Sequence, residues 1–432
     1  MAPQPAESKA QFDQQVAAHN TKMFIADGTF FNLGQAFMES NSVLPTFVST
    51  LTTSPFLIGL VSSLRSFGYL MPQIFVAGYI DRQEYKKPFM MKAGYLMRIS
   101  ALIMAASALL AVKNRGLALA IFYLSLIGVA FGDGFGGPPW MEIVAITIPA
   151  SRRSGLFGTM QACGGVAAFS AGFVIQWLLG TAVPYPYNYA LTLFLGALFL
   201  CCSLLCMVFI KDPGGKPPSE VTSMREYLRR LPSAWTSNIL FRQVIYTRLL
   251  MGAMYLALPF FAIHAQKDLA FAPSMVGLFV SAQMVGSVGG GPLWGYLGDR
   301  HGPRWIVRLV TVVFMLTGTL ALLARLSFFA GLTALAFPLY LMLYACLGAG
   351  FGGTWIGYTN YVLDIAPESQ RATLVGLYNT ISAPLTLLTM VGGWLLQATN
   401  YTVLFAVEAA IVFISVILAW RLPDSREYRT QA

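Results

Sequence analysis

Charged residues are scarce in this chain of 432 residues: Asp, Glu, Lys and Arg make up 11% of it, against roughly 25% in a typical soluble domain. Apolar residues make up 56%, and the mean hydropathy is +0.63. So few charges cannot cover a surface that faces water, which excludes an ordinary soluble fold. The composition indicates a protein whose solvent is the lipid bilayer.

Residues that bind metals or form disulfides are also few. The five cysteines all fall inside predicted helices, where sulfur acts as a small apolar group. The three histidines form no HExxH or other ligand spacing, and no Walker sequence GxxxxGK[ST] occurs. No nucleophile with a nearby base stands out either. We therefore expect no disulfide, metal site, cofactor, nucleotide site or enzymatic activity.

The sequence is rich, in contrast, in long apolar stretches. About twelve of them lie between Met23 and Trp420, and each is long enough to cross a hydrocarbon core of about 30 Å as a helix. They begin near Met23, Pro55, Pro88, Leu117, Gly155, Tyr189, Phe241, Pro273, Trp305, Leu332, Thr373 and Tyr401. The predicted fold class is an all-α membrane protein with twelve transmembrane helices.

The basic residues are divided unequally between alternate loops. The net charge of +10 is dispersed over short loops, so it indicates membrane topology rather than nucleic-acid binding. With both termini in the cytoplasm, most of the 28 Lys and Arg residues are cytoplasmic, and the external loops hold only four: Lys113, Arg115, Lys267 and Arg325. This asymmetry predicts a multi-pass inner-membrane protein with cytoplasmic N- and C-termini. The apolar run after the polar residues 1–22 is long and contains polar side chains, so it does not resemble a cleavable signal.

The chain repeats itself at an offset of 218 residues. The matching pairs run through helices and loops and include Pro55 and Pro273, Gly59 and Gly277, Asp81 and Asp299, Arg82 and Arg300, and Arg153 and Arg371. Six helices per half preserve orientation, so we expect two six-helix bundles related by a pseudo-two-fold axis along the membrane normal. The predicted domains are a cytoplasmic tail (1–22), a first bundle (23–210), a cytoplasmic linker (211–240), a second bundle (241–421) and a cytoplasmic C-terminal tail (422–432).

A loop motif follows the eighth predicted helix. From Gly295 the chain reads GYLGDRHGPR, which resembles the loop signature GxLADRxGRK of the major facilitator superfamily, in its bacterial form with twelve helices. The resemblance covers the whole chain. The copy after the second helix, GYIDRQEYKK, is one residue shorter before the Asp and lacks the turn glycine. The predicted gating motif comprises Gly78, Asp81, Arg82, Gly295, Asp299, Arg300, Gly302 and Arg304. The alternative is that these charges serve only to orient the loops.

The resemblance implies two bundles that rock against each other around a central cavity. It implies a secondary active or facilitative transporter of a small organic solute, with a coupling proton or ion left open, and a monomer in the bilayer. The fourth helix lacks the arginine of many proton-linked members, and the fifth lacks the Gly-Pro pair typical of antiporters, so the motifs give no support to proton-coupled export. The alternative from another class is a membrane-embedded solute sensor on a transporter scaffold.

Polar side chains in the first helices are candidates for the solute pathway, because an ionisable group at bilayer depth is costly to keep there. Asn32, Gln35 and Glu39 recur at i, i+3 and i+7, which predicts one stripe facing the cavity. The rise per residue makes Arg65 in the second helix a plausible partner of Glu39. Interhelical hydrogen bonds without any role in transport would give the same pattern.

Two glycine-rich helices in corresponding positions of the repeat are the predicted binding region. They span residues 125–144 and 347–367, and their glycines would weaken or bend each helix near mid-membrane. The alternative explanation is that the glycines allow helices to pack closely. Arg98 in the third helix has Asp27 and Asp133 within reach, and the sequence leaves that choice open. The further pathway candidates are Asp133, Trp140, Arg248, Tyr255, Trp355, Tyr358 and Asn360.

Overall fold

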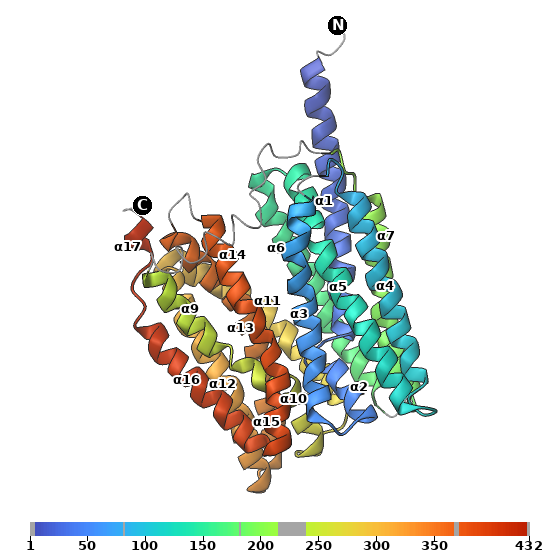
Figure 1. The fold of residues 1–432 in the computed structure, drawn as a ribbon, viewed down its shortest axis with the longest axis vertical. Coiled ribbons are helices and arrows are strands. Elements are labelled where there is room, and N and C mark those ends of the chain that lie inside the picture. The colour runs from blue at the N-terminus through green and yellow to red at the C-terminus, as the bar shows by residue number, and fades with distance from the viewer. Residues whose placement is uncertain (1–4, 81–82, 181–182, 215–238, 367–370, 430–432) are drawn as a thin grey trace. The chain divides into compact units, whose positions relative to one another are not determined.

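The computed structural model describes residues 5–80, 83–180, 183–214, 239–366 and 371–429, which are helical without any strand (Figure 1). Their contacts form two compact units, each of which is described by itself. Unit 1 comprises Met1–Met38, Gly68–Ala171 and Thr181–Val221. Unit 2 comprises Glu39–Phe67, Gly172–Gly180 and Thr222–Ala432.

The described residues of the first half, up to residue 214, form helices α1 to α7 (Figure 1). They are α1 (Pro5–Phe37), α2 (Val43–Leu51), α3 (Pro55–Ile80), α4 (Lys87–Leu109), α5 (Arg115–Thr147), α6 (Ala150–Leu178) and α7 (Tyr187–Phe209). Local chemistry sets several of their ends. The side chain of Asn114 caps α5 by accepting a hydrogen bond of 3.0 Å from the backbone N–H of Leu117. Pro88 lies in the first turn of α4, where its missing N–H has no helical partner to lose.

The second half is built in the same way, but two of its membrane spans are broken. The elements are α9 (Ile239–Met251), α10 (Met254–Lys267), α11 (Met275–His301), α12 (Pro303–Phe329), α13 (Thr333–Ile365), α14 (Arg371–Ser382), η2 (Ala383–Leu387), α15 (Leu388–Ala398), α16 (Tyr401–Trp420) and α17 (Arg426–Arg429). The predicted span from Phe241 is therefore α9 followed by α10, with a break at Gly252 and Ala253. The span from Thr373 is α14, a 3₁₀ turn that starts next to Pro384, and α15.

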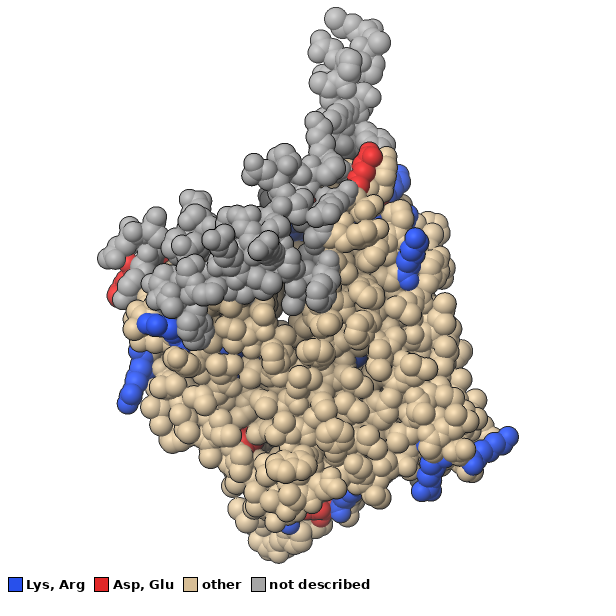
Figure 2. All heavy atoms as spheres, viewed as in Figure 1, with Lys and Arg blue, Asp and Glu red and all other residues tan. Residues whose placement is uncertain are grey.

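Ten helical segments of the described chain are long and apolar enough to cross a membrane. Helices α1 and α3 occupy the two remaining predicted spans, so the predicted class of a twelve-helix, all-α membrane protein is confirmed. On the face drawn in Figure 2, most of the charged side chains lie near the ends of the helices, and the belt between them is almost wholly uncharged. That distribution suits helices whose middle parts contact hydrocarbon.

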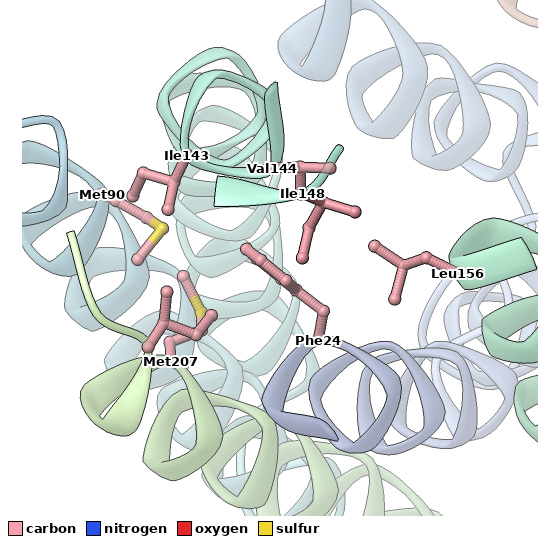
Figure 3. Close-up of a cluster of buried hydrophobic side chains, with 8 residues drawn as sticks. Phe24, Met90, Ile143, Val144, Ile148, Leu156 and Met207 are labelled. Carbon is pink, nitrogen blue, oxygen red and sulfur yellow. The ribbon is translucent and has the colours of Figure 1, made fainter. Parts of the chain in front are cut away.

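One end of unit 1 is held by a cluster of buried apolar side chains (Figure 3). The cluster consists of Phe24, Met90, Ile143, Val144, Ile148, Leu156, Met207 and Ile210. Phe24 of α1 lies at its centre and meets the ring of Trp140 edge-on, with 5.2 Å between centroids. Because lipid tails are as apolar as these side chains, close packing rather than exclusion of water stabilises such a cluster within a membrane.

The glycine-rich stretches of α5 and α13 pack against neighbouring helices and do not interrupt their own. A Cβ atom at Gly132 of α5 would lie 2.6 Å from the backbone N of Met97 in α4, and one at Gly348 of α13 would lie 2.8 Å from the N of Ser287 in α11. Both helices are continuous, including Pro138 and Pro139 in α5. The expected interruption is therefore absent, since these glycines permit close contact between backbones.

Candidate solute pathway

A buried carboxylate lies in unit 1 on the first membrane helix. Asp27 of α1 is 5% exposed. Its Oδ1 accepts a hydrogen bond of 2.7 Å from the hydroxyl of Ser203 in α7, and its Oδ2 accepts one of 2.8 Å from the indole N–H of Trp140 in α5. Both oxygens are thus bound by donors from two other helices, as a carboxylate inside a membrane requires.

Arg98 of α4 joins the same network. Its Nη2 donates a hydrogen bond of 2.8 Å to the hydroxyl of Ser203, and its Nε donates one of 3.0 Å to the carbonyl of Leu200. The hydroxyl of Ser203 therefore links the guanidinium to the carboxylate of Asp27. Asp27 exerts the stronger electrostatic attraction on Arg98, and Asp133 exerts the second. Of the two carboxylates that the sequence left open, Asp27 is the one linked to Arg98, while Asp133 lies half-buried on α5.

The predicted polar stripe of the first helix is shorter than expected. Helix α1 ends at Phe37, so Glu39 lies in the turn before α2 rather than on a helical face. There its carboxylate accepts hydrogen bonds from the backbone N–H of Asn41 (2.6 Å), the side chain of Asn41 (3.1 Å) and the hydroxyl of Ser42 (3.1 Å). Arg65 is not among its partners in the described structure. The predicted ion pair between Glu39 and Arg65 does not form in this conformation, because nearer donors of the turn bind the carboxylate.

The two remaining residues of the stripe stay on α1. Asn32 donates a hydrogen bond of 2.8 Å to the carbonyl of Gly28 in its own helix, and Gly164 of α6 packs directly against it. A Cβ atom at Gly164 would lie 2.6 Å from Nδ2 of Asn32. Gln35 is half-buried. Asn32 therefore lies where α1 packs against α6, and its place in the solute pathway stays a prediction.

A buried arginine lies among tyrosines in unit 2. Arg248 of α9 is 6% exposed, and its guanidinium carbon lies 6.0 Å from the centroid of the Tyr255 ring. The hydroxyl groups of Tyr255 and Tyr378 interact with it, and Tyr358 of α13 also lies near its charge. Tyr378 of α14 stacks on Tyr358, with 6.2 Å between centroids and 19° between ring planes. Sequence reasoning missed Tyr378, because nothing in the pattern of α14 distinguishes it from other apolar positions.

The sequence repeat relates these two clusters. The offset of 218 carries Trp140 of α5 onto Tyr358 of α13. Trp140 binds Asp27 on α1, and Tyr358 lies beside Arg248 on α9, the first membrane helix of the second half. Each half thus places an aromatic side chain from one equivalent position beside an ionisable group on its first membrane helix. The two ionisable groups have opposite charge.

The last two predicted pathway residues lie on another face of α13. Trp355 is 72% exposed, and Asn360 is also exposed. A Cβ atom at Gly352 would meet nothing within 4 Å among the described residues. No described helix covers this face of α13 at Trp355 and Gly352, whereas Tyr358 is buried against α9 and α14.

Helices from both halves of the sequence meet within unit 2, at the end that we predict to be external. We call this the outer contact; it consists of Gly59 and Ser63 of α3, Gly172 of α6, Gly277 of α11 and Thr389 of α15. The hydroxyl groups of Ser63 and Thr389 form a hydrogen bond, and Thr389 donates another of 2.8 Å to the carbonyl of Gly59. The backbones of Gly172 and Gly277 approach so closely that neither has room for a Cβ atom. Within unit 2, α6 is thus in direct backbone contact with α11 at this end.

The loop motif after α11 is at the protein surface. Asp299 and Arg300 are exposed, and Arg300 donates a hydrogen bond of 2.5 Å to the hydroxyl of Tyr296. Gly302 has φ of +87°, a backbone conformation that disfavours side chains, so the turn requires this glycine. Arg304 forms an ion pair of 3.4 Å with Asp424 in the C-terminal segment.

The remaining residues of the gating motif are Gly295, Gly78, Asp81 and Arg82, and the structure describes only the first two. Gly295 does not lie against a neighbouring helix, since a Cβ atom there would meet nothing within 4 Å in the described chain. Gly78 lies in the last turn of α3. Asp81 and Arg82 lie outside the described residues, as do residues 367–370, which precede α14.

Comparison with known proteins gives a family for residues 26–432. The sequence profile of the Major Facilitator Superfamily matches residues 26–264 and residues 245–432. An "Uncharacterized MFS-type transporter YuxJ" of Bacillus subtilis (strain 168) is 26% identical over 417 residues, covering 88% of this chain and 97% of that protein. "Multidrug resistance protein MdtG" of Serratia proteamaculans (strain 568) is 24% identical, with 92% of each chain covered. A mutant of the nucleoside transporter NupG has a similar fold, with a TM-score of 0.70 at 17% identity over 93% of this chain and 100% of that one.

Proposed function

Since this chain belongs to the Major Facilitator Superfamily and is a membrane transporter, we propose that it moves a small organic solute through the side chains described above. Transport proceeds by alternating access, either secondary active or facilitative, and needs no covalent chemistry. The family and the apolar spans place the protein in a membrane, which we take to be the bacterial inner membrane with both termini on the cytoplasmic side.

The observation that carries this proposal is a pair of ionisable clusters enclosed by membrane-spanning helices. Asp27 and Arg98 are each 5% exposed, and Arg248 is 6% exposed. Charges at this depth cost several kcal/mol unless they are paired, so a chain retains them where they act on a solute or an ion. Asp133 and the open face of α13 with Trp355 complete the proposed pathway.

The outer contact is the proposed external gate. Its backbones are in contact at Gly172 and Gly277, and the hydroxyl groups of Ser63 and Thr389 join it at α3 and α15, so small movements would disrupt this fit. The loop motif around Asp299 is the proposed inner gate, in which a carboxylate favours the N-terminus of a neighbouring helix. A coupling proton or ion is a second ligand, and the proposed site for it is the carboxylate of Asp133.

Transport is tested with purified protein in proteoliposomes. A mixed panel of small organic solutes is placed outside, and mass spectrometry identifies the solutes that enter. Solute should enter vesicles that contain the protein faster than protein-free vesicles. Binding of a solute without entry would instead indicate a sensor, and would refute the transport function.

A further inference from the structure

Arg248 is the one described arginine that is buried without an anionic partner or a complete set of hydrogen bonds. Its Nε and Nη1 atoms are enclosed, and neither has a partner among the described residues. No described ion pair includes Arg248, and the groups whose electrostatics act on it are tyrosines. Arg98, which is equally buried, shows the contrast, because it is bonded to Leu200 and Ser203 and attracted by Asp27.

Arg248 cannot avoid being a buried, unpaired positive charge by losing its proton, since arginine stays protonated in proteins. A buried charge without a counter-charge is strongly destabilising, and an isolated cation is attracted by any anion that reaches it. The tyrosine rings that surround Arg248 provide only partial compensation, through their π-faces and hydroxyl oxygens. The described residues thus bring no carboxylate to Arg248, and an anion that reached it would gain the full interaction.

The surrounding side chains are held in place independently of any ligand. Tyr358 interacts with the hydroxyl groups of Thr247 and Ser415, and Ser415 donates a hydrogen bond of 2.7 Å to the carbonyl of Thr247. Tyr378 is stacked on Tyr358. Rigid aromatic walls around a fixed guanidinium form a preorganised site, which lowers the entropic cost of binding.

Arg248 also lies next to the two helix breaks of unit 2. Its carbonyl accepts a hydrogen bond of 3.0 Å from the N–H of Gly252, where α9 gives way to α10. Gly252 in turn packs against Leu385 of η2, at the second break. Discontinuous helices are a common setting for binding sites within membranes, because their free backbone groups can face a ligand.

We propose that Arg248, Tyr255 and Tyr378 form a subsite for the carboxylate group of the transported solute, which makes the solute a small organic anion. This inference rests on the transport function proposed above. Arg248 supplies the charge, and the tyrosines supply apolar ring faces for the body of the solute and hydroxyl donors for its carboxylate.

The test measures the thermal stability of the purified full chain with benzoate and acetate as probes and their neutral amides, benzamide and acetamide, as controls. Wild-type protein should show a higher Tm with the carboxylates than with the amides or with chloride at equal concentration. Arg248→Gln should weaken carboxylate binding by about 10- to 100-fold, the effect of losing a charge-assisted hydrogen bond. It should also raise the ligand-free Tm, because it removes an unpaired buried charge. Arg248→Lys should retain part of the carboxylate response, and Arg242→Gln, on the same helix, should behave as wild type.

Equal Tm shifts with carboxylates and amides, or with carboxylates and chloride, would overturn the proposal even if the variants do not fold. A lower ligand-free Tm in Arg248→Gln together with an unchanged carboxylate response would also overturn it. Flux measurements separate this result from the transport function. If neutral solutes enter the vesicles and Arg248→Gln does not change their rate of entry, the anion subsite alone is refuted. If carboxylates bind through Arg248 but no solute enters, transport alone is refuted.

Discussion

Replacing Gly277 with alanine should open the outer contact. Gly277 of α11 lies against Gly172 and Gln176 of α6 with no space between the backbones. An alanine Cβ atom would lie 2.9 Å from the Cα of Gln176, and closer still to the carbonyl oxygen of Gly172. Real Cβ atoms essentially never lie within 3.0 Å of such atoms. Because the obstacle is backbone and not the end of a flexible side chain, the two helices must separate.

The size of the effect follows from the cost of overpacking. Forcing an extra methyl group into a packed contact typically costs about 1–3 kcal/mol. The transporter avoids that cost by adopting a state in which α6 and α11 are apart. A change of 1–3 kcal/mol in the balance between two states alters their ratio by about 5- to 150-fold. A protein that mostly holds the outer contact closed should therefore acquire a large open population.

Pulsed electron paramagnetic resonance can detect the open population from the distance between two spin labels. The labels are attached at Thr53 and Thr399, both exposed positions of unit 2. The labels are placed in a background without the five native cysteines. Gly277→Ala should add a population with a longer distance between labels. Gly289→Ala on the same helix is the matched control, because its Cβ atom would meet nothing within 4 Å. Identical distance distributions in the two folded variants would refute the role of the outer contact as a gate.

Three further predictions concern single carboxylates. Asp27→Asn should slow transport and lower stability by roughly 1.5–3 kcal/mol, the worth of hydrogen bonds to a charged group, and parallel flux and thermal unfolding measurements check both effects. Glu408→Leu should raise Tm, because both carboxyl oxygens of Glu408 are enclosed without a partner among the described residues. An unsatisfied buried polar group costs about 1–3 kcal/mol of stability. An unchanged or lower Tm would contradict this prediction. Burial alone would raise the pKa of Asp424, but hydrogen bonds from Arg426 and the charges of Arg304 and Arg426 outweigh it and hold the pKa below its ordinary value. The ion pairs of Asp424 with Arg304 and Arg426 should therefore add roughly 0–1 kcal/mol to the folding stability at neutral pH, and this stability should be lost as the pH falls below about 4. Asp424→Asn should remove that pH dependence from acid unfolding curves.

Most of the fold follows from the sequence because the bilayer permits few alternatives. A chain in hydrocarbon must satisfy its backbone groups internally, so a long apolar stretch becomes a helix. Helices α3 and α16 begin at Pro55 and Tyr401, as predicted. The breaks after Met251 and after Ser382 were not predicted. Apolar composition looks the same on both sides of a break, and Pro384 alone does not show whether a helix bends or ends.

The site was harder to predict because it depends on which neighbours compete for each polar group. Asp27 and Arg98 were placed within reach of each other correctly, but Ser203, which links them, is one of many hydroxyl groups in apolar helices. The pairing of Glu39 with Arg65 assumed that α1 continues beyond Phe37. The chain turns there instead, and donors two and three residues away bind the carboxylate first.

The two clusters differ in a way that bears on how a solute can drive the cycle. A ligand shifts a conformational equilibrium only by the difference between its affinities for the two states. Asp27 already has protein partners for both oxygens, so a solute that replaced them would gain little. Arg248 has enclosed donors without partners among the described residues, so an anion would gain the whole interaction there. The carbonyl of Arg248 is also bonded to Gly252, at the break that packs against Leu385 at the other break. An anion drawn to Arg248 would act directly on the two points where the helices of unit 2 can bend, which couples recognition in the second half to movement of its helices.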